Sequence, residues 1–220
     1  MVTTALKNKQ KQQLHSLNLS ENNVTSQGCL MVCDLINRCP TLEEIQLQNN
    51  DIDNTGAQTL VEAIRGRKFT KLDVDNNRIS GQVLSDLLVV VPVRKLNLVR
   101  NKLTDAQVEP LKQSLVSKRD LKILYMSHNK MSDRALGMLA DGLKVNAGIE
   151  EIQFTHNDLS LPNGLAVIRA LKQLPMLGKL SLNSCNLIQP CLEELRNALL
   201  DNQALTDISL YSNEIDAEGA

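Results

Sequence analysis

The chain has 220 residues and a formal net charge of −1, and its apolar fraction is 42% although aromatic residues make up only 2%. A nearly neutral chain has no global field for nucleic acid or an anionic membrane, so electrostatic recognition must come from a local patch. No apolar run reaches the roughly 20 residues of a membrane span. We therefore expect no membrane segment, no nucleic-acid partner and no cofactor.

Residues 1–13 are polar and carry lysines, and we expect them to form at most a partial N-terminal cap. From Leu14 onward, one pattern of four apolar residues and an asparagine recurs eight times. Its first copy comprises Leu14, Leu17, Leu19, Asn22 and Val24. The copies begin at Leu14, Leu42, Phe69, Val93, Leu121, Ile149, Leu177 and Leu205. Such a period identifies a repeat architecture.

Each copy predicts a short strand followed by a turn. Leu17 and Leu19 alternate as strand residues do, which directs both side chains into the core and the residues between them outward. The recurring asparagine can hydrogen-bond the backbone of a bend, so stacked copies are expected to form a ladder. Cys185 takes the asparagine position in the seventh copy.

Helical periodicity separates the strand motifs. One predicted helical face consists of Ala135, Leu136, Leu139, Ala140 and Leu143, with the spacing of an amphipathic helix. The expected N-caps are Asp53, Thr104 and Ser132, and prolines at 40, 92 and 175 are expected to mark helix ends.

Two departures from regularity concern length. The third copy, from Phe69 to Val93, is shorter than the others because its helix is compressed into Gln82–Val91. We interpret this as harmless variation, and the alternative is that the shorter segment makes room for a neighbour. The chain stops at 216–220, where an eighth helix should begin. We expect residues 14–220 to form a single domain that is open or truncated at its C-terminus, and a protein partner is expected either on the concave face or at the open C-terminal end.

The chain resembles the ribonuclease-inhibitor-like class of leucine-rich repeats. The matching pieces are Asn22-Asn23-Val24 with Gly28, Asn50-Asp51-Ile52 with Gly56, and Asn213-Glu214-Ile215 with Gly219. The resemblance implies an α/β solenoid of about eight repeats, curved as a horseshoe, with parallel strands on the concave face and helices on the convex face. Relatives include enzyme inhibitors, GTPase activators, actin-filament caps, innate-immune sensors and axonemal components.

Candidate partner-binding residues lie at outward strand positions and in the turns that follow. Repeats four and five place Val99, Ile123 and Tyr125 outward beside Lys95 and Arg100, which is the composition of an interface centre. Tyr211 is a second candidate anchor near the C-terminal end. Ordinary surface remains the alternative, because single exposed apolar residues are common.

His128 and His156 are also candidates, since their spacing of one repeat should stack them on adjacent coils about 5 Å apart. A metal would need further ligands, and the neighbouring equivalents are Arg100 and Ser184. A pH-sensitive contact or ordinary solvated histidines are the readings left open. We expect no metal site.

No catalytic signature occurs, and the five cysteines are interpreted as reduced, partly buried thiols of a cytoplasmic protein. We therefore expect a non-catalytic protein–protein interaction module or scaffold, with a cytoskeletal, axonemal or ciliary assembly as one setting. The alternatives are an enzyme inhibitor, a sensor domain of a larger chain and a Ran-type GTPase-activating protein. The last of these carries an arginine-bearing loop in an early repeat, whereas Gln46 to Leu60 contains no arginine.

Overall fold

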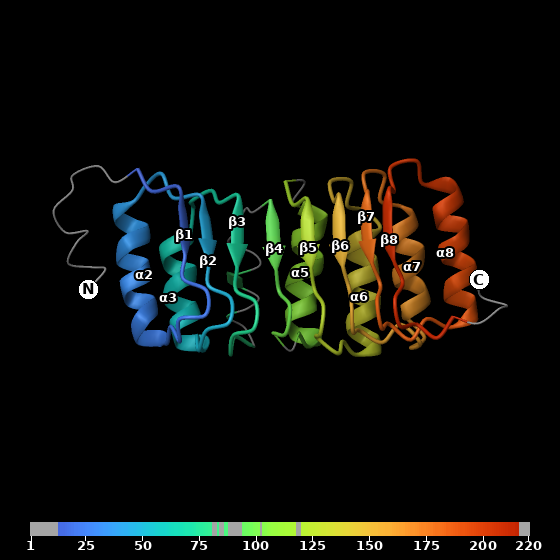
Figure 1. Ribbon diagram of the computed structural model, residues 1–220, viewed down its shortest axis with the longest axis horizontal. Helices are drawn as coiled ribbons and strands as arrows, with labels where there is room; N and C mark the ends of the chain where they lie inside the picture. The colour runs from blue at the N-terminus through green and yellow to red at the C-terminus, as the bar shows by residue number, and fades with distance from the viewer. Residues whose placement is uncertain are drawn as a thin grey trace.

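The computed structural model describes residues 13–80, 83, 86–87, 94–101, 103–117 and 120–215. Eight parallel strands lie side by side in chain order in one sheet, and six helices of the described residues line one side of it (Figure 1). This confirms the predicted leucine-rich-repeat solenoid. No helix of the described residues is long and apolar enough to cross a membrane.

The elements alternate between strand and helix along the chain. The strands are β1 (Ser16–Asn18), β2 (Glu44–Gln46), β3 (Lys71–Asp73), β4 (Lys95–Asn97), β5 (Ile123–Tyr125), β6 (Glu151–Gln153), β7 (Lys179–Ser181) and β8 (Asp207–Ser209). The helices are α2 (Ser26–Arg38), α3 (Asn54–Ile64), α5 (Asp105–Ser117), α6 (Asp133–Leu143), α7 (Gly164–Lys172) and α8 (Gln189–Asp201). We call the side of the sheet opposite the helices the strand face.

The strand register follows the repeat. Each strand pairs in parallel with the next, so that Leu17 lies beside Ile45 and Leu124 beside Ile152. The short third copy keeps this register, because Leu72 still pairs with Leu96. Of its compressed segment, Gln82–Val91, only residues 83, 86 and 87 are among the described residues. Val93 and Pro92 lie outside them.

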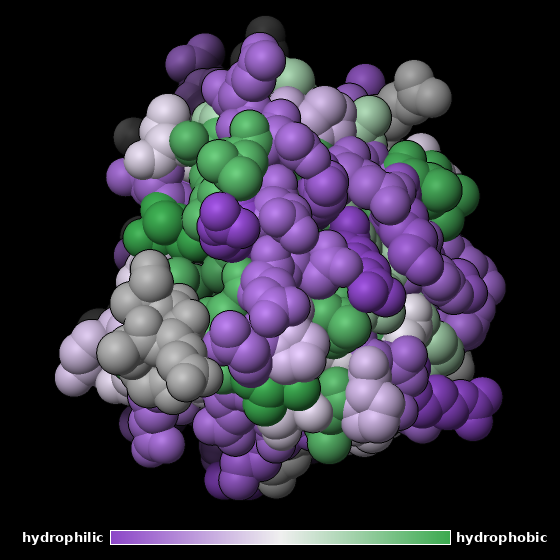
Figure 2. Space-filling model, turned by 90° about the vertical axis from the view of Figure 1, so that its right-hand side faces the viewer, coloured by the Kyte–Doolittle hydropathy of each residue, from purple (hydrophilic) through white to green (hydrophobic). Residues whose placement is uncertain are grey.

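The core lies between the sheet and the helices. The middle residue of each inner strand is buried, as with Ile45 and Leu124, and both phenylalanines are buried as well. In β8 the equivalent residue, Ile208, is 38% exposed, because β8 has a described neighbour on one side only. Figure 2 looks onto this end of the array, where apolar patches are broken up by polar side chains.

The predicted asparagine ladder joins successive turns. The Asn129 amide nitrogen donates to the carbonyls of Leu98 and Met126 at 2.9 and 2.8 Å, and its oxygen accepts from the backbone N–H groups of Asn101 and Leu103. The Cys185 thiol donates to the Phe154 carbonyl at 3.3 Å. Each repeat is thus bonded to its neighbour through turn backbone that would otherwise be buried without partners.

The expected helix starts are largely confirmed. Asp53 accepts from the N–H groups of Thr55 and Gly56, and Ser132 accepts from Ala135. The Thr104 N–H donates to the Gln107 side chain at 3.0 Å, which is one half of a capping box. Helices α2 and α7 end before Pro40 and Pro175. Pro110, in contrast, lies inside α5, where a proline cannot donate the usual i→i−4 bond.

The two chain ends provide no test of the expected caps. Residues 1–12 of the predicted N-terminal segment and residues 216–220 of the expected eighth helix start lie outside the described residues. The single domain over 14–220 stays a prediction, although the described repeats from β1 to β8 form one continuous sheet.

Candidate functional site

Four of the predicted residues lie together on the strand face. Lys95 belongs to β4 and pairs in register with Ile123 of β5. Tyr125 lies two residues further along β5, and Val99 follows β4 on the same face. All four are half-buried. We call Lys95, Val99, Ile123 and Tyr125 the strand-face patch.

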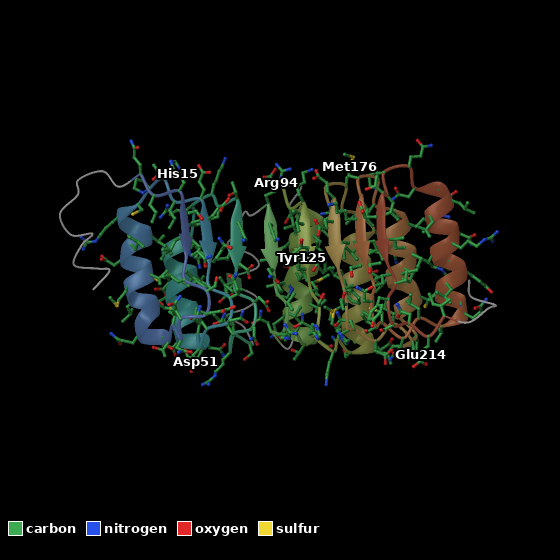
Figure 3. All side chains as sticks on the ribbon, viewed as in Figure 1. His15, Asp51, Arg94, Tyr125, Met176 and Glu214 are labelled. Carbon is green, nitrogen blue, oxygen red and sulfur yellow. The ribbon has the colours of Figure 1, made fainter. Side chains whose placement is uncertain are left out.

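Tyr125 lies on β5, near the middle of the row of strands (Figure 3). The Lys95 ammonium lies over its ring, 4.3 Å from the centroid, and its hydroxyl donates to the Glu151 carboxylate at 2.6 Å. Burial, followed by this hydrogen bond, holds the pKa of Tyr125 well above its usual range. The side chain is therefore a neutral phenol held by β4 and β6, so little conformational entropy remains to be lost when a partner binds.

Acidic side chains border the patch on its β3 side. Asp73 is buried and accepts from the Asn97 amide at 3.1 Å. Burial and the nearby charge of Asp73 raise the pKa of Asp75 to about 6, although the Arg100 guanidinium lowers it in part. The strand face thus places the carboxylates of Asp73 and Asp75 near Lys95 and Arg100, while Lys71 of β3 lies in register with Lys95.

Arg100, His128 and His156 lie in the turns that follow β4, β5 and β6. All three have positive φ angles, of 54°, 59° and 58°. The two imidazole rings stack with centroids 4.2 Å apart and planes 28° apart, which confirms the expected stacking. Burial, the Arg100 charge and His156 all lower the pKa of His128.

A hollow of about 610 Å³ opens beside the stacked rings. Its walls include both histidines, Lys130, Asp158, Ser184 and Asn186. Lys130, at a φ of 49°, follows the ladder asparagine Asn129. We call Arg100, His128, Lys130 and His156 the histidine edge.

Tyr211 does not join the patch. Its side chain is 78% exposed, and it follows β8, which is three strands from β5 in the sheet. A groove of about 490 Å³ runs over β6, β7 and β8, and neither tyrosine lines it. The two candidate anchors are therefore separate features of the strand face.

Sequence reasoning missed Glu151 and Lys130. The Glu151 carboxylate accepts a hydrogen bond from the Tyr125 hydroxyl. The repeat spacing already places Glu151 beside Ile123 on the neighbouring strand, so strand register could have identified it. Lys130 could have been found as the residue after the ladder asparagine. Only the folded chain shows that it shares a hollow with His128 and His156.

The chemistry available at the cysteines is limited by burial. All five thiols are free and buried, and burial raises the pKa of Cys29 to about 12 and that of Cys185 to about 11. A thiol is a nucleophile only as a thiolate, so these groups are unreactive near neutral pH. Among the described residues, no group of three His, Cys, Asp or Glu side chains is placed to hold a metal ion.

Comparison with known protein families and sequences identifies related chains. Residues 10–33 and 38–61 match the family described as Leucine Rich repeat. The mouse (Mus musculus) ribonuclease inhibitor is 25% identical over 209 residues, covering 91% of this chain and 46% of the inhibitor. Human (Homo sapiens) NACHT, LRR and PYD domains-containing protein 5 is 30% identical over 244 residues, covering 94% of this chain and 20% of that protein. The chain thus spans less than half the length of these curated relatives.

Two solved structures share the fold. The tropomodulin C-terminal domain of Caenorhabditis elegans aligns with a TM-score of 0.51 at 10% identity, covering 63% of this chain and 85% of that domain. TLR13 in its complex with ssRNA13 aligns with a TM-score of 0.51 at 16% identity, covering 91% of this chain and 36% of TLR13. At these identities the likeness concerns the backbone architecture.

Proposed function

Since the chain is a leucine-rich-repeat protein of the ribonuclease-inhibitor-like class, we propose that it is a non-catalytic module that binds a protein partner through the strand-face patch. The observation that carries this proposal is Tyr125, a large side chain held by Lys95 and Glu151 beside Ile123 and Val99. Aromatic anchors surrounded by partly buried apolar and polar groups are typical of interface centres.

The rest of the strand face supports a scaffold. Most outward strand positions hold small or polar side chains, such as Asn18, Gln46, Ser181 and Ser209. High-affinity inhibitors concentrate aromatic and charged anchors at their binding surface, whereas the aromatic anchors among the described residues of this face are Tyr125 and, apart from it, Tyr211. We propose a structural role in a cytoplasmic assembly, with the cytoskeleton as the first setting to search.

An enzyme inhibitor is the second candidate, favoured by the match to the mouse ribonuclease inhibitor over 91% of this chain. The two candidates differ in a direct assay. Addition of the purified protein should leave ribonuclease activity unchanged if the protein is a scaffold, whereas stoichiometric inhibition would favour the second candidate.

The main test compares the wild-type protein with a Tyr125→Ala/Ile123→Ser double variant as bait in cytosolic and cytoskeletal fractions. Loss of Tyr125 removes the anchor, so we expect binding of the specific partner to weaken about tenfold or more. The matched control is Asp207→Ser/Ser209→Ala, which changes the equivalent outward positions of β8. Circular dichroism must show that both variants fold.

Equal retention of every captured protein by the two variants and the wild-type protein would exclude the strand-face patch as the binding site. Tyr125→Phe gives a finer comparison, because it keeps the ring beneath Lys95 and removes only the hydroxyl that donates to Glu151. We expect this variant to retain most of the binding.

A further inference from the structure

The histidine edge is a local concentration of positive charge in a chain that is nearly neutral overall. Arg100 and Lys130 are exposed, and within the described part of the chain neither forms a salt bridge. The third repeat differs, because Arg78 pairs with Asp51 at 2.8 Å. At the described turn positions, the basic groups without a salt bridge are therefore Arg100 in repeat four and Lys130 in repeat five.

Acidic residues occupy the same turns nearer both ends of the solenoid. Glu21 in the first repeat and Glu214 in the eighth have positive φ angles like the members of the histidine edge. Asp158 occupies the Lys130 position in repeat six and borders the hollow as an ionised carboxylate, because hydrogen bonds from the Ser160 hydroxyl and N–H lower its pKa. Asp75 attracts Arg100 from the strand-face side. A ligand with negative charge is thus favoured beside Arg100 and Lys130 rather than beside Asp158.

The histidine edge continues directly from the strand-face patch. Arg100 follows Val99 in the chain, and His128 lies three residues after Tyr125. A segment that packs an apolar side chain beside Tyr125 can therefore extend over the edge of the sheet to the hollow at His128 and His156. The hollow of about 610 Å³ has room for several side chains of such a segment.

We propose that the partner presents an acidic peptide segment to the histidine edge, and that binding strengthens as the pH falls and the stacked imidazoles become charged. This rests on the proposed function and specifies its partner. Two imidazoles with centroids 4.2 Å apart repel each other when both are protonated. Carboxylates placed beside them attract both rings and so offset that repulsion. The Arg100 charge adds to the attraction for an acidic segment. In the absence of the segment, the same charge opposes protonation of His128.

The folded chain offers substitutions that the turn geometry tolerates. Asn49 and Asn76 occupy the turn position of His128 in earlier repeats at φ angles of 55° and 47°. Asn23 and Asn186 occupy the position of Lys130. The variants His128→Asn/His156→Asn and Arg100→Asn/Lys130→Asn therefore remove charge while keeping a residue that adopts this conformation readily.

The test measures the fluorescence anisotropy of a labelled deca-glutamate peptide, with deca-glutamine as the neutral probe. An ordinary histidine gains its charge between about pH 7.5 and about pH 5.5, where glutamate stays ionised, and the carboxylates of the bound peptide oppose the lowering of the His128 pKa. We expect wild-type affinity for deca-glutamate to rise about tenfold over this range. His128→Asn/His156→Asn should abolish the rise, and Arg100→Asn/Lys130→Asn should weaken binding throughout. Ser212→Asn, at the same turn position in repeat eight, is the matched control.

Affinity that is independent of pH, equal binding of deca-glutamine, or a pH effect that survives in the histidine variant would each overturn the proposal. A thymidine oligonucleotide that binds more tightly than deca-glutamate, with the same dependence on the histidines, would overturn the assignment to a protein segment. Capture that depends on Tyr125 and Ile123 would still support the proposed function after any of these failures. The two proposals can thus fail separately.

Discussion

At the residue scale, Asp75 illustrates how the strand face changes the properties of single side chains. One of its carboxylate oxygens is buried and has no hydrogen-bond partner among the described residues. Burial and the charge of Asp73 raise its pKa from 3.8 to about 6. The folded protein therefore binds this proton at a pH at which the unfolded chain has already released it.

This shift predicts how stability depends on pH. The contribution of Asp75 to stability is fully present below about pH 4 and is lost as the pH rises through about 6. Asp75→Asn removes the buried charge, and Asn183 occupies the same position in repeat seven. We expect the variant to raise the free energy of unfolding at pH 7 by about 1 kcal/mol, a value reduced for solvent screening. Urea denaturation at pH 4 and pH 7 checks this, and an equal gain at both pH values would contradict the assigned cause.

At the scale of the element, the turn after each strand is the joint between repeats. Asn129 serves the backbone of its own turn and that of the preceding repeat. Asn22 in the first repeat is exposed, and its amide donates to the Ser20 carbonyl. Asparagine at the same turn position thus makes more buried hydrogen bonds in the fifth repeat than in the first.

The two asparagines should respond differently to truncation. Asn129→Ala leaves buried backbone donors and acceptors without partners, and we expect the free energy of unfolding to fall by about 2–4 kcal/mol. Asn22→Ala should cost about 1 kcal/mol or less, because water can replace the bonds at an exposed turn. Equilibrium denaturation of both variants tests this, and similar losses would show that the ladder does not couple the repeats.

At the scale of the whole molecule, stability depends on the position of a repeat in the stack. A solenoid repeat contacts only its neighbours, so an inner core residue is covered on both sides. Leu124 in β5 is fully buried between β4 and β6, whereas Ile208 in β8 is 38% exposed. Each has the same role in its own repeat.

Truncation of these two core residues should therefore differ in cost. We expect Leu124→Ala to lower the free energy of unfolding by about 3 kcal/mol, the usual cost of a buried cavity. Ile208→Ala should lower it by about 1 kcal/mol, because part of its surface already contacts water. Chemical denaturation of the two variants measures the difference. If Ile208→Ala lowered the free energy of unfolding more than Leu124→Ala does, the described neighbours of Ile208 would not account for its burial.

Most of the fold could be predicted because the repeat encodes it locally. Leu17, Leu19 and Asn22 mark strand and turn in the first copy, and their spacing places every later copy in register. The stack of His128 and His156 follows from the same spacing. The position of Pro110 inside helix α5 could not be predicted, because local propensity favours a helix end at a proline.

The sequence by itself determined the solenoid, its eight strands, their outward residues and the residues of the strand-face patch, because each depends on contacts one repeat apart. Only the tertiary structure decided that Tyr125 is held between Lys95 and Glu151, that the pKa of Asp75 is raised, and that Lys130 shares a hollow with the stacked histidines. These properties depend on side-chain orientation and on water excluded by several strands together. A repeat pattern specifies neither of these.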